Sequence, residues 1–298
     1  MSKETKNLQD DSENDSVERP SCWTSATQHR RRRFRLAIAA SHHCNLWLGK
    51  WFPKSFPFVF VVGYPKSGTS WASQMIADCL HLPYPQHAVL PLGFSAVLQT
   101  HTKYSPDLPR SVYVIRDGRD VMVSLYFHLA ANKQVSQNPS IYRGVAGLSS
   151  SQTIRERLPE FIQGQARRPF SSSLNWGDHV RSFFAADMRS PLIRYEDLRE
   201  HGSATLQRVV TTLTGKPVSD QTLNATLDRF SFQRLAGRQP GKHDPQSYLR
   251  SGQSGEWRKY FSRDAAETFQ EHFGEGLIAG GYVRDDSWVS DLDMKQCA

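Results

Sequence analysis

The sequence predicts an α/β protein, built as a single three-layer domain around a central parallel sheet. Three short apolar runs, at residues 58–62, 111–115 and 191–195, are typical of buried strands, and segments with helical spacing separate them. Strands that alternate with helices imply parallel βαβ connections, with helices covering both faces of the sheet. The chain has 298 residues, 38% hydrophobic and 22% charged, which is enough for one sizeable core.

The connecting segments differ in how strongly they are patterned. Residues 81–109 are rich in proline and glycine and are expected to be irregular, crossing an edge of the sheet. Residues 132–172 are loosely patterned, so we expect a functional loop or lid there. Helices are predicted at residues 69–80, 121–131, 154–161, 176–188, 206–213, 221–230 and 264–278.

The N-terminal segment differs in composition from the rest. Residues 1–35 are polar, end in the basic cluster Arg30–Arg35 and are expected to be disordered. The apolar run at 36–40 is far shorter than the roughly 20 residues that span a membrane, so no transmembrane segment is predicted. We expect a short amphipathic helix that packs on the domain through Trp47, Leu48, Trp51 and Phe52, and a peripheral membrane contact through the arginines and tryptophans is left open.

Charge and cysteine content narrow the class of partner only in part. The net charge of +8 favours an anionic partner, which could be a nucleotide, a nucleic acid, a membrane surface or an acidic glycan. The four cysteines show neither a C-x-x-C pattern nor metal-ligand spacing, so a reducing, cytoplasmic location is expected. No acidic cluster is placed to hold a divalent ion, and no metal is expected.

The most informative stretch begins at the first strand. Five apolar residues from Phe58 are followed by a loop from Gly63 to Gly68 and then by a helix. This arrangement points backbone N–H groups and a helix N-terminus at one place, which binds phosphate or sulfate. The two glycines are spaced as in a Walker A loop, but Thr69 stands where that loop has lysine, and the lysine is Lys66. The pattern therefore argues against an ordinary nucleotide kinase.

Residues Pro65–Trp71 resemble the 5′-phosphosulfate loop of the sulfotransferases that use 3′-phosphoadenosine 5′-phosphosulfate (PAPS). Four blocks between Phe58 and Ser262 agree with that family. The resemblance implies a P-loop-like sulfotransferase fold, which we expect over residues 36–290, and PAPS as co-substrate without a metal. Residues 291–298 are expected to be a flexible tail. In the loop it implies that PAPS is held by Lys66, Ser67, Gly68, Thr69, Ser70 and Trp71.

The other blocks supply the rest of the implied cofactor site. Arg116 and Ser124 resemble the family's 3′-phosphate motif, an arginine at a strand end and a serine near a helix start. By resemblance, Tyr195 lies near the adenine and Phe232 packs against it. Arg250 and Gly252 match the family's R-K-G-x-x-G-[DE]-W loop over the 3′-phosphate, while Ser251 stands where a lysine is usual.

Catalysis needs a base, because the acceptor loses a proton as its new bond to sulfur forms. Thr100-His101 resembles the family's K-T-H segment, with Gln99 in place of the lysine, so His101 is the expected base; His87 and His128 are the alternatives. Lys66 is expected to stabilise charge on the leaving phosphate or the sulfonate.

The sequence leaves rival functions and a range of acceptors open, and it makes one prediction about the oligomeric state. The rival functions are a P-loop kinase and a non-enzymatic anion-binding module that uses the basic N-terminal arm. The acceptor is expected to be a hydroxyl or amine of a small molecule, a lipid or a carbohydrate, and not a nucleic acid. The family's dimer motif is poorly met, because Arg263 replaces its valine, so that dimer is not expected to form. The corresponding motif positions are Arg258, Ser262, Arg263 and Glu267.

Overall fold

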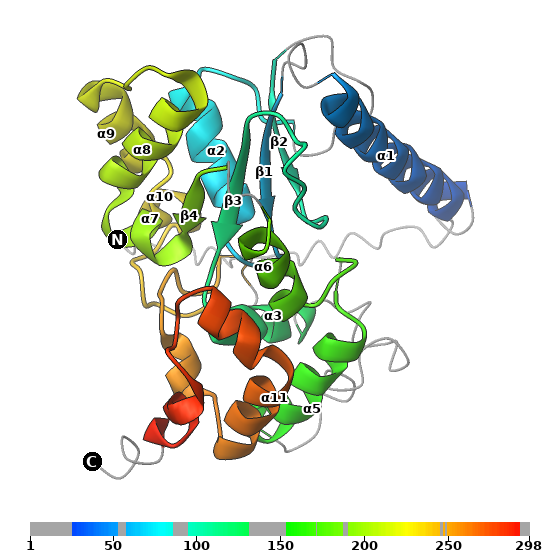
Figure 1. Ribbon diagram of the computed structural model, residues 1–298, viewed down its shortest axis with the longest axis vertical. Coiled ribbons are helices and arrows are strands. Elements are labelled where there is room, and N and C mark those ends of the chain that lie inside the picture. The colour runs from blue at the N-terminus through cyan, green and yellow to red at the C-terminus, as the bar shows by residue number, and fades with distance from the viewer. Residues whose placement is uncertain are drawn as a thin grey trace, which may run out of the picture.

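A parallel sheet with strand order β2-β1-β3-β4 lies at the centre of the computed structural model (Figure 1). The structure describes residues 26–52 (26–35 by backbone alone), 58–85, 95–130, 153–170, 172–186, 190–244, 247 and 249–292. Val61 of β1 pairs with Gln99 of β2 on one side and with Val112 of β3 on the other. The strands are β1 (Val59–Gly63), β2 (Val97–Thr100), β3 (Ser111–Ile115) and β4 (Leu192–Arg194).

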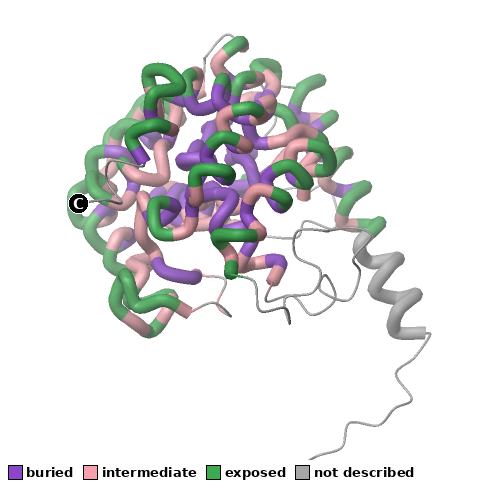
Figure 2. Tube along the Cα trace, turned by 90° about the horizontal axis from the view of Figure 1, so that it is seen from below, coloured by how far each residue is buried: buried purple, intermediate pink, exposed green. Residues whose placement is uncertain are grey.

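Helices cover both faces of this sheet, which confirms the predicted three-layer α/β fold. Alternate strand residues point to opposite faces, so Phe60 and Tyr113 pack in one core cluster while Val61 and Val112 pack in the other. Figure 2 shows the buried chain gathered between the layers. The first face carries α3 (Gly118–Ala130), α5 (Ile154–Arg167), α6 (Trp176–Phe184) and α11 (Arg263–Ala279). The second carries α2 (Thr69–Cys79), α8 (Gly202–Thr214) and α9 (Asp220–Arg229).

Several elements depart from the sequence prediction. Strand β2 lies within residues 81–109, which were expected to be irregular; it is short, and its pairing to β1 rather than its own pattern defines it. The third predicted strand ends earlier than expected, because a short helix, α7, begins at once after it. The remaining short helices are α7 (Tyr195–Glu200), α10 (Phe232–Ala236) and two 3₁₀ helices, η1 (Glu256–Lys259) and η2 (Asp286–Val289).

The N-terminal helix α1 (Ala26–Trp51) is longer than predicted and begins inside the segment expected to be disordered. It packs on the domain through buried residues such as Asn45 and Leu46. Leu48 packs against the core as expected, but the prediction that Trp47, Trp51 and Phe52 do the same is wrong, since all three are exposed. Helical geometry explains this, because Trp47 lies nearly opposite Asn45 around the helix axis.

No helix in the described part of the chain is long and apolar enough to cross a membrane.

Candidate active site

Each strand of the sheet ends in a residue that the sequence singled out. The glycine loop follows β1, His101 follows β2, Arg116 follows β3 and Tyr195 follows β4. Because all the strands are parallel, these residues meet at one edge of the sheet. Ligands of open α/β sheets bind at this carboxyl edge. The topology therefore assembles the predicted site from four separate sequence blocks.

The glycine loop has a backbone that favours glycine at its end. Gly68 has φ of 84°, and a β-carbon on it would lie 2.6 Å from Cδ2 of Tyr195. Lys66 also adopts a positive φ, of 67°, which is uncommon outside glycine. The loop delivers the chain into the N-terminus of α2, where backbone N–H groups are available to an anion.

Two hydroxyls of this loop fit an anionic ligand. Ser67 Oγ and Thr69 Oγ1 are buried, and neither has a hydrogen-bond partner in the structure as described. A buried polar group without a partner costs about 1–3 kcal/mol, so such groups are normally satisfied by a ligand or by water. Their position in and directly after the glycine loop fits the phosphosulfate group that the sequence resemblance implied.

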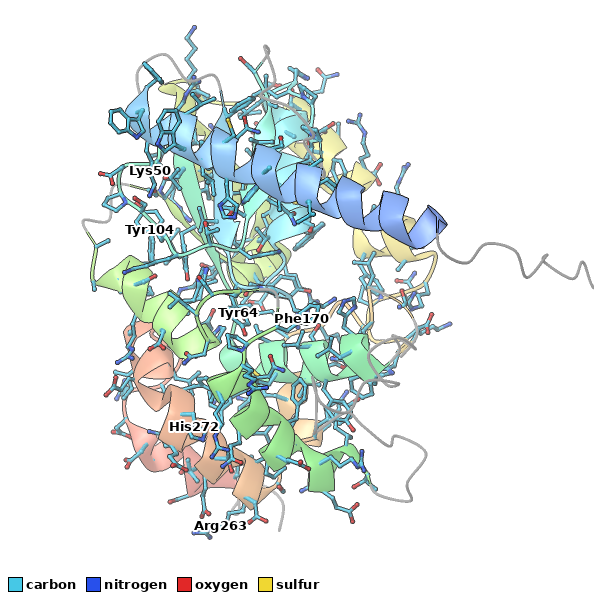
Figure 3. The ribbon with its side chains drawn as sticks, turned by 90° about the vertical axis from the view of Figure 1, so that its right-hand side faces the viewer. Lys50, Tyr64, Tyr104, Phe170, Arg263 and His272 are labelled. Carbon is cyan, nitrogen blue, oxygen red and sulfur yellow. The ribbon has the colours of Figure 1, made fainter. Side chains whose placement is uncertain are left out.

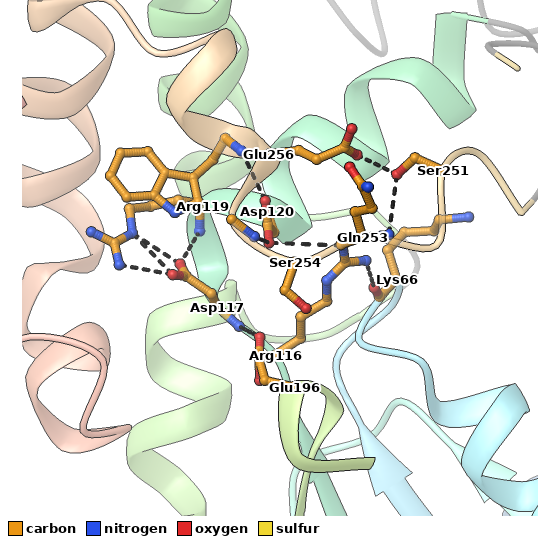
Figure 4. A network of polar contacts seen from close by, with 12 residues as sticks. Lys66, Arg116, Asp117, Arg119, Asp120, Glu196, Ser251, Gln253, Ser254 and Glu256 are labelled. Carbon is orange, nitrogen blue, oxygen red and sulfur yellow. Dashed lines mark hydrogen bonds and ion pairs between the residues drawn. The ribbon is translucent and has the colours of Figure 1, made fainter. Parts of the chain in front are cut away.

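Arg116 joins the glycine loop to a distant segment. Its Nη1 donates to the backbone oxygen of Lys66 at 3.3 Å, and its Nη2 donates to that of Gln253 at 3.1 Å (Figure 4). The guanidinium also lies over the Tyr195 ring, 4.3 Å from its centroid. Arg116 is buried and keeps its positive charge, so it supplies fixed positive potential to the site.

Asp120, on the first turn of α3, fixes the segment that carries Gly252. Its carboxylate accepts hydrogen bonds from the backbone N–H of Gly255 (2.6 Å) and of Trp257 (2.9 Å) (Figure 4). Burial raises its pKa, although Arg116, 3.9 Å away, works in the opposite direction. Sequence reasoning missed Asp120, because its partners are backbone groups more than a hundred residues away that no local pattern reveals.

Arg250 and Ser251 share one carboxylate. Arg250 Nη2 lies 2.6 Å from Glu256 Oε2, and both side chains are buried. Ser251 Oγ donates to the same oxygen of Glu256. At the position where the family usually has lysine, this chain therefore has a neutral side chain that supports the Arg250–Glu256 pair.

One cavity of about 910 Å³ connects these features. It is lined by most of the predicted cofactor residues: Lys66, Gly68, Ser70, Trp71, Arg116, Ser124, Tyr195, Phe232, Arg250 and Gly252. Ser67 and Thr69 are buried and are not among the lining residues. The cavity also has lining residues that the sequence gave no reason to select, since they belong to no motif: Gln74, His201, Ser203 and Leu227.

Aromatic side chains form part of the cavity wall. Trp71 Nε1 donates to the backbone oxygen of Phe230 at 2.8 Å, which fixes the indole, and its ring lies 5.7 Å from that of Tyr195. Gly252 has φ of 63°, and a β-carbon on it would overlap the ring of Phe232. Planar walls of this kind suit the flat faces of a nucleotide base.

Lys66 lies close to two other positive charges, so a negatively charged ligand would be favoured there. Burial, together with the charges of Arg116 and Arg250, lowers its pKa from 10.5 to about 7. Three cationic side chains around one space repel one another, and an anionic ligand would relieve that repulsion.

His101 is held by one hydrogen bond in a form suited to a base. Its Nδ1 lies 2.6 Å from the backbone oxygen of Gly63. Because a carbonyl oxygen only accepts, Nδ1 carries the proton, and Nε2 of the neutral ring keeps its lone pair. Burial lowers the pKa of His101, and the bond to Gly63 offsets part of that effect. The ring is therefore neutral near pH 7.

Two further histidines support the segment around His101. His179 Nε2 donates to the backbone oxygen of Thr102 at 3.0 Å, while its Nδ1 lies 2.7 Å from the Tyr113 hydroxyl. Burial lowers the pKa of His179 to about 4, so it stays neutral. His42 on α1 lies with Nε2 3.0 Å from Thr100 Oγ1. Neither was selected from the sequence, since each lies far along the chain from any motif.

Of the two alternative bases, His87 and His128, the structure describes only His128. His87 lies outside the described residues. His128 lies on α3, and its pKa is lowered by burial and by the charge of Lys66. His128 is therefore close enough to Lys66 for that charge to lower its pKa, whereas His101 is hydrogen-bonded to Gly63 at the start of the glycine loop.

Comparison with known proteins identifies the protein family to which the chain belongs. The family profile described as Sulfotransferase domain matches residues 95–281. The chain belongs to the sulfotransferase family. Mouse sulfotransferase 2B1 is 25% identical over 261 residues, covering 74% of this chain and 71% of that protein. Human sulfotransferase 2A1 is 23% identical over 262 residues, and the match covers 74% of this chain and 84% of that protein.

A solved sulfotransferase shares the fold. Mouse sulfotransferase SULT7A1, crystallised with PAP, matches with a TM-score of 0.56 and 21% identity, covering 86% of this chain and 94% of that one. The family match begins at residue 95, so the glycine loop and α1 both lie N-terminal to it.

Proposed function

We propose that this sulfotransferase transfers the sulfuryl group of PAPS to a hydroxyl or amine of its acceptor, with His101 as the general base. The observation that supports this most is the joint placement of Lys66, Arg116 and His101 at one sheet edge. An anion-binding loop, a buried arginine and a neutral histidine are the three groups that such a transfer needs.

PAPS would supply the sulfuryl group, and this chain's own residues would hold it. The amides after Gly63, with Ser67, Thr69 and Ser70, would bind the 5′-phosphosulfate end. Arg116, Ser124 and Arg250 would bind the 3′-phosphate. Tyr195, Trp71 and Phe232 would flank the adenine, as their place on the cavity wall supports.

His101 would take the acceptor's proton at Nε2. The acceptor oxygen or nitrogen gains a bond to sulfur while the bond between sulfur and the 5′-phosphate oxygen breaks, and the proton moves to His101. Lys66 would stabilise the negative charge that grows on the departing phosphate. Preorganised charge of this kind commonly supplies the largest share of an enzyme's acceleration.

The two rival functions find less support. A P-loop kinase needs lysine at position 69, where this chain has threonine, and its lysine lies instead at φ of 67° within the loop. A binding module without catalysis leaves the geometry of His101 unexplained. The acceptor class stays broad, covering small molecules, lipids and carbohydrates, and we place the enzyme in the cytoplasm.

Calorimetric titration tests the co-substrate. Purified protein is titrated with 3′-phosphoadenosine 5′-phosphate and with ATP, both without magnesium. We expect the bisphosphate to bind much more tightly than ATP, and Arg116→Ala to weaken it by roughly 10- to 150-fold, the loss of a charged hydrogen-bonding group. Arg181→Ala, an exposed arginine on α6, is the matched control and should bind normally. Equal binding of ATP, or none of either ligand, would overturn the proposal.

A transfer assay tests the reaction. Radiolabelled PAPS is offered with a panel of phenols, alcohols, amines and sugars, and label transfer is measured for wild-type protein and for His101→Ala. Label transfer that survives in His101→Ala at the wild-type rate would remove the base from the proposal while leaving PAPS in place.

A further inference from the structure

Helix α1 has two faces of different character. Its inner face rests on the domain through Ser41, Asn45 and Leu46, all buried. Its outer face carries large apolar side chains in water: Leu36 is 63% exposed, Trp47 54% and Trp51 67%. Phe52, directly after the helix, is 55% exposed. Figure 3 looks at α1 from this outer side, with Lys50 near its C-terminal end.

This outer face concentrates exposed apolar surface. Of the six large hydrophobic side chains that are well exposed in the described residues, four are Leu36, Trp47, Trp51 and Phe52. Of the other two, Leu235 lines the cofactor cavity and Ile278 lies on α11. The rings of Trp47 and Trp51 lie 5.5 Å apart and form one patch. Contiguous apolar surface of this kind marks a contact site.

The charged residues of the same helix are all basic. It contains five arginines between positions 30 and 35 and Lys50, and no aspartate or glutamate. Six of the chain's 37 basic residues therefore lie in α1 and none of its 29 acidic ones does, so this helix accounts for most of the net charge of +8. A symmetric contact between two copies would bring two helices of the same net charge together.

We propose that the outer face of α1 docks this enzyme on the surface of an anionic membrane. Tryptophan rings favour the headgroup region, and arginines and lysines favour anionic lipids, so the apolar outer face and the basic composition of α1 select the same partner. Because α1 does not meet the requirement for a membrane span, it would lie in the plane of the interface with its inner face still on the domain.

The docked helix is tied directly to the catalytic edge of the sheet. His42, on the inner side of α1, lies 3.0 Å from Thr100, the residue that precedes His101. Helix α1 would therefore lie between the membrane and the end of β2, the strand that His101 follows. The docking itself depends only on the surface of α1 and stands independently of the reaction.

Vesicle flotation with the full chain tests the docking. The protein is mixed with vesicles of phosphatidylcholine alone and with vesicles in which about a third of the lipid is phosphatidylserine, at low and at high salt. We expect binding to the anionic vesicles only, weakened by salt because part of the attraction is electrostatic. The double variant Trp47→Ala/Trp51→Ala should lower binding by about tenfold or more, since it removes the apolar patch.

Matched variants separate docking from folding and catalysis. Ile278→Ala removes an exposed apolar side chain from α11 and should bind vesicles like the wild type. Lys50→Glu, which reverses a charge on the docking face, should weaken binding to anionic vesicles. All three variants should bind 3′-phosphoadenosine 5′-phosphate normally, which shows that each is folded and keeps its cofactor site.

Three results would overturn the proposal. The first is binding that is equally strong to neutral and to anionic vesicles and that is unchanged in Trp47→Ala/Trp51→Ala. The second is a dimer by light scattering that the double variant dissociates, without any vesicle binding, which would assign the face to a second copy of this chain. The third is binding to heparin or RNA without binding to vesicles, which would assign the charge to a soluble polyanion.

Discussion

His101 and Gly63 are joined by a hydrogen bond of 2.6 Å between the ring Nδ1 and the backbone oxygen. Gly63 is the last residue of β1 and the first position of the glycine loop. The bond therefore fixes the histidine to the same strand end from which the glycine loop leaves. It also sets the tautomer, since the donor must be Nδ1, and directs the basic Nε2 away from the strand.

Removing this imidazole should stop turnover without loss of co-substrate. We expect His101→Ala to lower kcat by about 10²- to 10⁴-fold, the usual contribution of a general base, while the Kd for 3′-phosphoadenosine 5′-phosphate changes little. His128→Ala is the comparison, because His128 is the rival histidine near Lys66. A dead His128→Ala beside an active His101→Ala would reverse the assignment.

The affinity for 3′-phosphoadenosine 5′-phosphate should fall as pH rises above about 7. Lys66 in the free protein has a pKa of about 7, and an anion beside it would raise that value. Above pH 7 binding must therefore take up a proton, and affinity should drop by up to about tenfold per pH unit. Below pH 7 the lysine is already charged, so this contribution is constant.

Calorimetry between pH 7.5 and 9.5 measures this slope. Lys66→Arg provides the control, since arginine stays charged throughout that range and should bind with little pH dependence. The same slope in wild type and in Lys66→Arg would show that another group is responsible.

Gly252 should be intolerant of a side chain. Alanine there adopts an unfavourable positive φ, costing about 1–2 kcal/mol, and its β-carbon overlaps the Phe232 ring on the cavity wall. Gly252→Ala should therefore lower both the melting temperature and the affinity for 3′-phosphoadenosine 5′-phosphate. Gly164→Ala is the contrast, because this helical glycine has open space around it and alanine should stabilise by roughly 0.5–1 kcal/mol. Identical effects at the two glycines would contradict the argument.

Asp120 should be a large contributor to stability. Its buried carboxylate satisfies the N–H groups of Gly255 and Trp257 and lies beside Arg116. Asp120→Ala removes the acceptor of those two N–H groups and the carboxylate beside Arg116, at a cost of about 3–5 kcal/mol, measured by chemical denaturation. Glu267→Ala removes an exposed partner of Arg263 and should change stability by less than about 1 kcal/mol. A small effect at Asp120 would mean that water replaces the carboxylate.

Much of this site could be predicted because its elements have strong local signals. The glycine loop, Arg116 and Tyr195 each follow a β-branched or apolar run that identifies a strand, and parallel topology then brings them together. Strand β2 could not be predicted in this way, since its four residues are a strand only through pairing with β1. His101 was therefore placed by resemblance, and the structure supplied its position at the sheet edge.

The other features that the sequence did not predict depend on contacts between residues far apart along the chain. Asp120, His42 and His179 act through partners far along the chain, which no window of sequence contains. The outward direction of Trp47 and Trp51 depends on the helical phase set by Asn45 and Leu46, whose burial only the fold determines. An apolar residue near a domain is usually expected to pack on it, and here the geometry of α1 prevents that.

One guanidinium, that of Arg116, holds the backbone of Lys66 and the backbone of Gln253 at the same time. These two loops come from opposite parts of the chain, and neither can detach without disturbing the other. They consequently form a single unit for local opening. Amide hydrogen exchange around residues 66 and 253 should slow together when a nucleotide binds, even though the ligand's two phosphate ends would touch different loops.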